Sequence, residues 1–162
     1  MNLQFTLRAG LTLGLLRSAW VAVEHFTSIR TTHLELVEPS YGLYLFLGAP
    51  LAWLYLLRSN RFNRPSLSLK GLLPAAVGAG AVAGAVNVLT FGLYTELLNP
   101  AYLDAFIEWN VSESSNTYEI ANREFRLPAF LDILLIHPLV FNPITASLMA
   151  FVLAKIWPTA QN

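Results

Sequence analysis

The chain has 162 residues, of which 55% are hydrophobic and only 12% charged, and its formal net charge is zero. Ordinary soluble domains carry about twice this charged fraction, so the polar coat that a water-soluble core needs cannot be assembled from this composition. The charge balance excludes a bulk basic surface for nucleic acid. The absence of cysteine excludes disulfides, thiolate metal sites and cysteine nucleophiles. The composition instead predicts helices that are solvated by lipid.

The first two apolar segments cover about residues 3–26 and 41–57. The first contains Arg8, Arg17 and Glu24, and its hydrophobicity continues past Arg17 without a small-residue cleavage site. We therefore interpret it as a retained first span and not as a cleavable signal peptide. The second segment is uncharged and just long enough to cross about 30 Å of hydrocarbon.

The last two apolar segments cover about residues 71–95 and 130–157. The third contains no charge, and the fourth contains Asp132 and His137 in its first half. Uncharged runs of this length are typical of spanning helices, and lipid requires every backbone polar group to be paired within the segment. We predict an all-α integral membrane bundle of four transmembrane helices that forms a single domain over residues 1–162.

The connections between the spans carry unequal charge, which predicts their orientation. Residues 58–70 contain four basic side chains and no acidic one, whereas residues 98–127 contain five acidic and two basic side chains. Because positively charged loops stay in the cytoplasm, residues 58–70 are expected inside and residues 98–127 outside. Four spans then place both termini in the cytoplasm, and we expect the inner membrane of a bacterium.

The segment at about residues 98–127 is the only sizeable part outside the predicted spans, and it is expected to be helical. Asn99 followed by Pro100 is typical of an N-cap and a first helical position. Aromatic residues from Tyr102 to Trp109 form one stripe, so this helix should lie on the outer membrane surface or cap the bundle. A second short helix is predicted at about 117–125, which completes a short extracytoplasmic helical segment between the third and fourth spans.

Small residues recur at every fourth position in two spans. They are Gly10 and Gly14 in the first span, and Ala76, Gly80 and Gly84 in the third. Such ridges let helix backbones approach closely in lipid. They predict helix-packing surfaces, either between helices of one chain or between two copies in a dimer.

Ionisable residues at membrane depth form the candidate polar membrane site. They are Arg17, Glu24, His25, Glu96, Asp132 and His137. Such groups usually face the protein interior or water. Glu24, His25, Glu96 and Asp132 are expected together at the outer rim, whereas Arg17 and His137 lie deeper. The group is either a polar track for a proton, an ion or an anionic headgroup, or a set of structural ion pairs and residues that reach water. No motif or ligand spacing predicts a catalytic, cofactor-binding or metal site.

Several short motifs together resemble a bacterial family of small four-span membrane proteins of unknown function, common in Bacteroidota. They are Trp20-x-x-x-Glu24-His25, Lys70-Gly71, Asn99-Pro100-Ala101-Tyr102-Leu103, Phe106-Ile107-Glu108-Trp109, Phe125-Arg126-Leu127 and Ile144-Thr145-Ala146-Ser147-Leu148-Met149-Ala150-Phe151. The chain departs from that family at Asn142, where relatives usually have glycine, and between Ser112 and Asn116. The resemblance implies the four-span architecture, but no catalytic residue and no cofactor.

From these features we predict a non-enzymatic accessory or interaction protein that is embedded in the lipid bilayer. Its partner would be another membrane protein or a second copy of the chain, and not a nucleic acid. The first alternative is a small oligomeric transporter or channel that uses Arg17, Glu24, Asp132 and His137. The second is a lipid-headgroup enzyme in which Glu24, His25 and Asp132 act as acid and base groups.

Overall fold

The computed structural model describes residues 2–58, 68–113 and 117–156, without the side chains of residues 69, 124, 125 and 127–133. All regular structure in these ranges is helical, which confirms the predicted all-α class. Three helical segments in them are long and apolar enough to cross a membrane, namely Leu34–Arg58, Lys70–Leu98 and Leu134–Ile156. Residues 59–67, which form most of the predicted basic loop, lie outside the described residues, as do residues 114–116.

The helices follow one another with short connections. In chain order they are α1 (Leu3–Phe26), the 3₁₀ turn η1 (Leu34–Leu36), α2 (Val37–Leu43), the π-helical turn η2 (Tyr44–Gly48), α3 (Ala49–Arg58), α4 (Leu69–Leu93), the π-helical turn η4 (Tyr94–Leu98), α5 (Tyr102–Glu113), α6 (Tyr118–Phe125) and α7 (Leu127–Ile156). From η1 to α3 the chain forms one continuous rod, so the second long helix begins at Leu34, earlier than the predicted position near residue 41.

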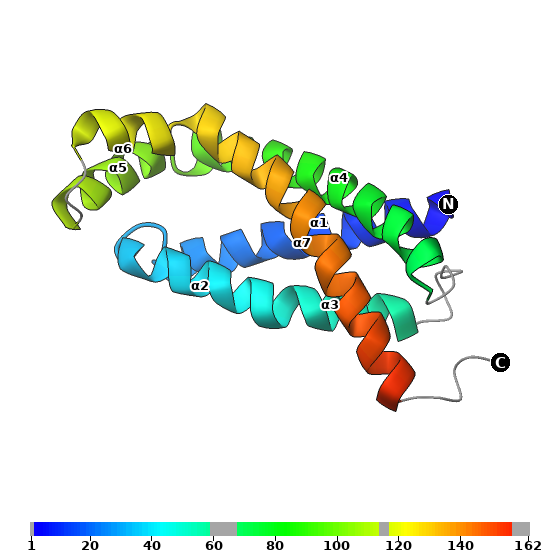
Figure 1. Cartoon of the computed structure of the whole chain (residues 1–162). Helices are drawn as coiled ribbons and strands as arrows, with labels where there is room; N and C mark the ends of the chain where they lie inside the picture. The colour runs from blue at the N-terminus through cyan, green and yellow to red at the C-terminus, as the bar shows by residue number, and fades with distance from the viewer. Residues whose placement is uncertain (1, 59–67, 114–116, 157–162) are drawn as a thin grey trace.

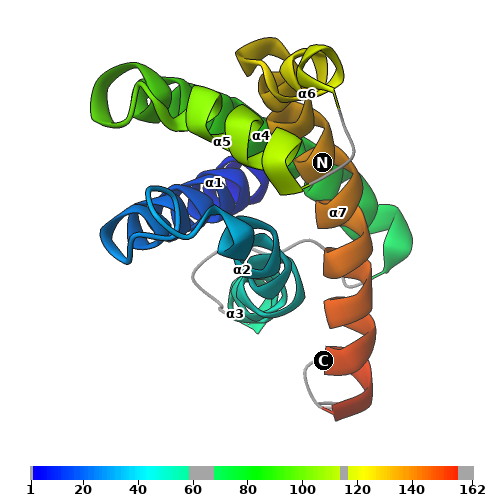
Figure 2. The ribbon, with the colours of Figure 1, turned by 90° about the vertical axis from the view of Figure 1, so that its left-hand side faces the viewer.

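The long helices run alternately in opposite directions (Figure 1). The short helices α5 and α6 form a hairpin at the end of the bundle where α1 ends and α2 begins, and we call this the hairpin end. Viewed from that end, α1 lies between α4 and the α2–α3 rod, and α7 lies along one side (Figure 2). Figure 1 also shows α7 crossing the bundle obliquely from the hairpin end to the opposite end.

Side chains cap the starts of α1, α4 and α6. The Asn2 side chain accepts a hydrogen bond from the backbone N–H of Phe5 at 3.1 Å. The hydroxyl groups of Ser68 and Thr117 accept from the N–H groups of Gly71 and Ile120, both at 3.4 Å. Each bond satisfies one of the N–H groups that a helix start leaves without a partner.

The first helix, α1, has the same bounds as the first predicted segment, but it is not among the three segments that qualify by length and hydropathy. It carries Arg8, Arg17 and Glu24, which lower its hydropathy. It packs along α4 for much of its length, and its buried side contains Phe5 and Leu13, both at most 1% exposed.

The third long helix, α4, lies between α1 and α7 and contacts both through glycines. A methyl group on Gly10 would lie 2.7 Å from the carbonyl oxygen of Ala79, and one on Gly14 would meet the side chain of Val86. On its other side, Gly80 lies against the carbonyl oxygen of Pro138 in α7. Gly84 approaches the α7 backbone next to Gly80, and Ala76 is fully buried in the core. The predicted small residues thus face neighbouring helices of the same chain.

A buried polar contact joins α3 to α7. The Nε1–H of Trp53, a fully buried side chain, donates to Oδ1 of Asn142 at 3.0 Å. The amide nitrogen of Asn142 donates to the carbonyl oxygen of Pro138 at 2.9 Å. Helix α7 remains continuous through Pro138 and Pro143. Asn142 therefore fixes the crossing of α3 and α7.

The close approach of α4 and α7 predicts unequal effects of two alanine substitutions in one helix. Gly80→Ala should lower the thermal unfolding midpoint in mild detergent, because the new methyl group collides with backbone, a strain of about 1–3 kcal/mol. Gly92→Ala is the matched control, since nothing lies within 4 Å of its added methyl group; it should gain about 0.5–1 kcal/mol from helix propensity. Equal midpoints for the two variants would contradict the α4–α7 contact.

Candidate functional site

A tight turn after α1 brings Arg30 back over the end of its own helix. Ser28 adopts a φ of 64°, the left-handed region that non-glycine residues rarely occupy. Its carbonyl oxygen accepts from the N–H groups of Thr32 at 2.8 Å and His33 at 3.1 Å, while the N–H of Arg30 donates to the carbonyl oxygen of Glu24 at 3.2 Å. The turn therefore sets the Arg30 side chain beside the last turn of α1.

The carboxylate of Glu24 is the centre of a buried charge cluster at the hairpin end. It is 1% exposed and accepts from Nε of Arg30 at 2.6 Å and from the hydroxyl of Ser40 at 2.7 Å. Nη1 of Arg17, two turns earlier on the same face of α1, lies 3.7 Å from it. The Ser40 hydroxyl in turn accepts from Nε1–H of Trp20 at 2.9 Å. One carboxylate thus joins α1, the turn and α2 through short charge-assisted bonds.

Aromatic rings from five elements (α2, η2, α4, η4 and α5) cover the two guanidinium groups. The Arg17 guanidinium lies 4.6 Å from the ring centre of Tyr41 and 5.2 Å from that of Tyr44. The Arg30 guanidinium lies 5.0 Å from the ring centre of Tyr102, and it also faces the rings of Phe91 and Tyr94. Cation–π attraction strengthens when the cation is removed from water, so these rings help to keep both charges inside the protein.

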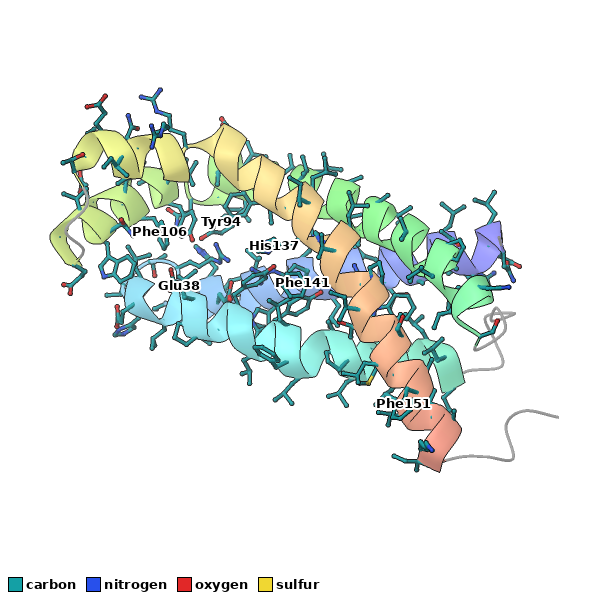
Figure 3. The ribbon with its side chains drawn as sticks, in the orientation of Figure 1. Glu38, Tyr94, Phe106, His137, Phe141 and Phe151 are labelled. Atoms are coloured by element: carbon teal, nitrogen blue, oxygen red, sulfur yellow. The ribbon has the colours of Figure 1, made fainter. Side chains whose placement is uncertain are left out.

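Arg30 also connects the bundle to the α5–α6 hairpin. The side-chain amide of Asn99 donates to the Arg30 carbonyl oxygen at 3.3 Å and to the Tyr94 hydroxyl at 3.0 Å. Figure 3 shows Tyr94 and Phe106 on the side of the hairpin that faces α1 and α2. In the sequence Asn99 resembled an N-cap of the next helix, but its amide group serves this contact between segments.

The structure brings together some of the six predicted polar residues and separates others. Arg17 and Glu24 form an ion pair, and His25 is next to them, with Nδ1 3.3 Å from the Tyr94 hydroxyl. Glu96 is exposed in η4. His137 hydrogen-bonds at 2.8 Å through Nδ1 to the hydroxyl of Tyr41 and stacks on its ring.

Glu24 and Asp132 were both expected at the outer rim of the bundle. Glu24 was expected near water at the outer rim, but protein covers it almost completely, because Arg30, Ser40 and the rings of the hairpin end lie over it. The side chain of Asp132 lies outside the described residues, so its predicted place in the site stays a prediction.

Sequence reasoning missed Arg30, Ser40 and the covering tyrosines. Arg30 lies in the connection after the first span, and its six-residue spacing from Glu24 fits no helical face. One signal was available: Arg30 is a basic residue in a connection that the charge pattern places outside, where basic residues are disfavoured. A buried ion pair with Glu24 explains that exception.

The charged groups of the cluster are engaged with one another. The Glu24 carboxylate accepts hydrogen bonds from Arg30 and Ser40 and lies within ion-pair distance of Arg17, so its oxygens are held by the protein's own side chains. No group of three His, Asp or Glu side chains that could hold a metal ion occurs in the part of the chain that the structure describes.

A cavity of about 290 Å³ lies beside the cluster, between α1 and α4, with Leu134 of α7 at its edge. Most of its wall is apolar, including Val21, Ala22 and Leu98, and Arg17 and Asn87 supply polar groups. Nε and Nη1 of Arg17 and Oδ1 of Asn87 are buried and lack a hydrogen-bond partner. Buried polar groups without partners are rare in native structures. The Arg17 and Asn87 side chains beside this cavity therefore have unused hydrogen-bonding capacity.

Comparisons of the chain with family models, with curated proteins and with solved structures found no match. The site is therefore interpreted from its own geometry.

Removing the central carboxylate should destabilise the fold strongly. Glu24→Gln leaves two buried guanidinium groups without a counter-charge, a loss of about 3–5 kcal/mol for a broken buried pair. Its thermal unfolding midpoint in mild detergent should fall far below that of the wild type. Glu38→Gln, an exposed carboxylate on α2, is the control and should change the midpoint little. Similar midpoints for both variants would show that Glu24 does not hold the hairpin end together.

Burial of Tyr102, which lies outside the three candidate spans, predicts a loss of stability at high pH. Burial raises the pKa of Tyr102 to about 12, although the neighbouring Arg30 lowers it in part. The folded state thus holds the phenolic proton more tightly than the unfolded state, and this contribution is complete below pH 10 and lost between about pH 10 and 12. Two pKa units correspond to about 2.7 kcal/mol.

Tyr102→Phe isolates this contribution. At neutral pH it should preserve stability or raise it slightly, since the buried Tyr102 hydroxyl has no hydrogen-bond partner. Between pH 10 and 12 the unfolding midpoint of the wild type should fall relative to that of the variant. Parallel pH curves for the two proteins would contradict the burial of this phenol.

Proposed function

We propose that the chain is a non-enzymatic accessory protein of a bacterial inner membrane, and that it presents the α5–α6 hairpin to a partner membrane protein outside the cytoplasm. In this proposal α1 is a fourth span, both termini are cytoplasmic, and the hairpin end faces outward. The basic residues of the segment 58–70 and the acidic residues of the segment 98–127 support this orientation.

The proposal rests on one observation, that the buried charge cluster contacts the residues that lead into and form the α5–α6 hairpin. Arg30 is held by Glu24 and contacts Tyr102 of α5 with its guanidinium and Asn99 with its carbonyl oxygen. The cluster therefore fixes the hairpin on the bundle. Buried charge of this kind contributes little net stability compared with an apolar core, but it can specify one arrangement of elements. A fixed arrangement of the hairpin is what a docking protein requires.

The faces of α1 support its role as a span. Its 24 residues extend roughly 36 Å. The side turned away from the bundle exposes Leu7, Leu11, Leu15 and Val23. Arg17 and Glu24 both point into the protein, so they do not meet lipid on this face.

The hairpin has one apolar face and one acidic face. Tyr102 and Phe106 are packed against the bundle and Ile107 is buried, whereas Asp104 and Glu108 are exposed. The chemistry offered to the outside is therefore anionic, and it favours a partner with a basic outer surface. A transport path through Arg17 and Glu24 is less well supported, because aromatic rings and Ser40 close the cluster.

Single cysteines test this proposal directly, since the natural chain contains none. Glu108→Cys on the hairpin, Glu35→Cys on η1 and Lys155→Cys at the end of α7 are all exposed positions. In spheroplasts of the native host, a membrane-impermeant maleimide carrying a photo-crosslinker should label positions 108 and 35 and leave position 155 unlabelled.

Illumination should then give one discrete protein adduct from position 108 and none from position 35, which lies at the same end of the bundle on another surface. Labelling of position 155 together with protection of 108 would reverse the proposed topology. Labelling at 108 with the same adducts as position 35 would contradict docking through the hairpin.

A further inference from the structure

The cavity between α1 and α4 has the composition of a site for an amphiphile. At one place its wall holds a guanidinium group and an amide, from Arg17 and Asn87, and elsewhere it is formed mainly by apolar side chains. Ligand pockets typically combine an apolar lining with few polar groups that fix orientation. The hydroxyl groups of Ser18 and Thr90 at the wall already bond to each other and to backbone carbonyl oxygens, so they are not the free donors.

The polar end of this cavity is formed by buried side chains that have unused hydrogen-bonding capacity. The Arg17 side chain is 8% exposed and Asn87 is 7% exposed, so both are more than nine-tenths buried. Nε and Nη1 of Arg17 have no hydrogen-bond acceptor, although Nη1 is within ion-pair distance of Glu24. A guanidinium group presents its N–H donors in a fixed planar fork, which suits an oxyanion.

The charges of the cluster point to the sign of the ligand. Among the described side chains it contains two guanidinium groups, Arg17 and Arg30, and one carboxylate, Glu24. This leaves one positive charge in excess next to the cavity. An unpaired buried charge is costly, and a counter-ion relieves that cost.

We infer that this cavity binds a single-chain, monoanionic amphiphile, with its anionic head on the Arg17 guanidinium and its chain along Val21, Ala22 and Leu98. The volume of about 290 Å³ lies at the lower end of the range for ligand pockets, about 300–1,000 Å³. It therefore suits a head with the start of one chain better than a two-chain lipid. The shared chemistry is a monoanionic oxyanion on one alkyl chain, either a fatty-acid carboxylate or a lysophospholipid phosphodiester. This site does not depend on a partner at the hairpin.

The test uses the purified full chain in a neutral maltoside detergent and palmitate that carries a diazirine in its chain. Illumination should give a 1:1 adduct, and peptide mapping should place it on the cavity segments of α1 and α4. Unlabelled palmitate or lysophosphatidylglycerol should compete, and whichever competes better identifies the head. Hexadecanol and lysophosphatidylcholine, which lack a net negative charge, should compete at least tenfold less well.

Two matched variants on one helix turn separate the cavity from general affinity for lipid. Ala22→Phe places a ring into the cavity and should weaken apparent palmitate affinity at least tenfold. Ala19→Phe adds the same ring at an exposed position of α1 that does not line the cavity, and it should bind as the wild type does. Thermal midpoints confirm that both variants fold. Equal labelling of the two variants, or equal competition by hexadecanol, would overturn the assignment.

Discussion

The hairpin end of this protein depends on one carboxylate held between two guanidinium groups. Glu24 is almost completely buried, and its bonds to Arg30 and Ser40 draw the turn and α2 onto the end of α1. Because an isolated charge at this depth would cost several kcal/mol, none of these partners can be present alone. The aromatic rings of Tyr41, Tyr44 and Tyr102 then follow as a requirement, since they cover the positive charges where water is excluded. The buried charges thus hold together α1, the turn that follows it and α2, which have few other contacts with one another.

The opposite half of the bundle is held by a different principle. There α4 approaches α1 and α7 so closely that only very small residues fit. Gly10 and Gly80 lie where an added methyl group would collide with the neighbouring helix, and Ala76 is fully buried. In lipid no hydrophobic force drives helices together, so close packing and a few buried polar contacts supply the attraction. The hydrogen bond from Trp53 to Asn142 is such a contact, and it fixes α3 against α7. Close packing of small residues therefore holds one half of the bundle, and the buried charge cluster holds the hairpin end.

The sequence predicted the features that depend on residues close together in the chain. It did not predict contacts between segments that are distant in the chain. The helices and the small-residue ridges are encoded by local periodicity, so residues such as Gly80 could be chosen from the sequence alone. The pairing of Arg17 with Glu24 also follows, because seven residues separate two groups on one helical face. Arg30 could not be placed in the same way: its position depends on the left-handed turn at Ser28, and serine gives no sequence signal for that conformation. The contacts of Tyr102 and Asn99 depend on how the hairpin folds back, which no local pattern specifies.

Among the described side chains, the excess positive charge links the Glu24 cluster to the cavity. A cluster that served only to hold the hairpin would be balanced by a second carboxylate near Arg17, and α1 and α4 offer positions for one at Ser18 and Asn87. The described residues instead place neutral groups there, and Nε and Nη1 of Arg17, a residue that lines the apolar cavity, are buried without a hydrogen-bond acceptor. Apart from His25, the side chains that line the cavity with Arg17 are uncharged, and this single guanidinium favours an anion over a metal ion or a cationic solute. The same arginine therefore contributes to two features, the ion pair with Glu24 and the polar end of the proposed anion site.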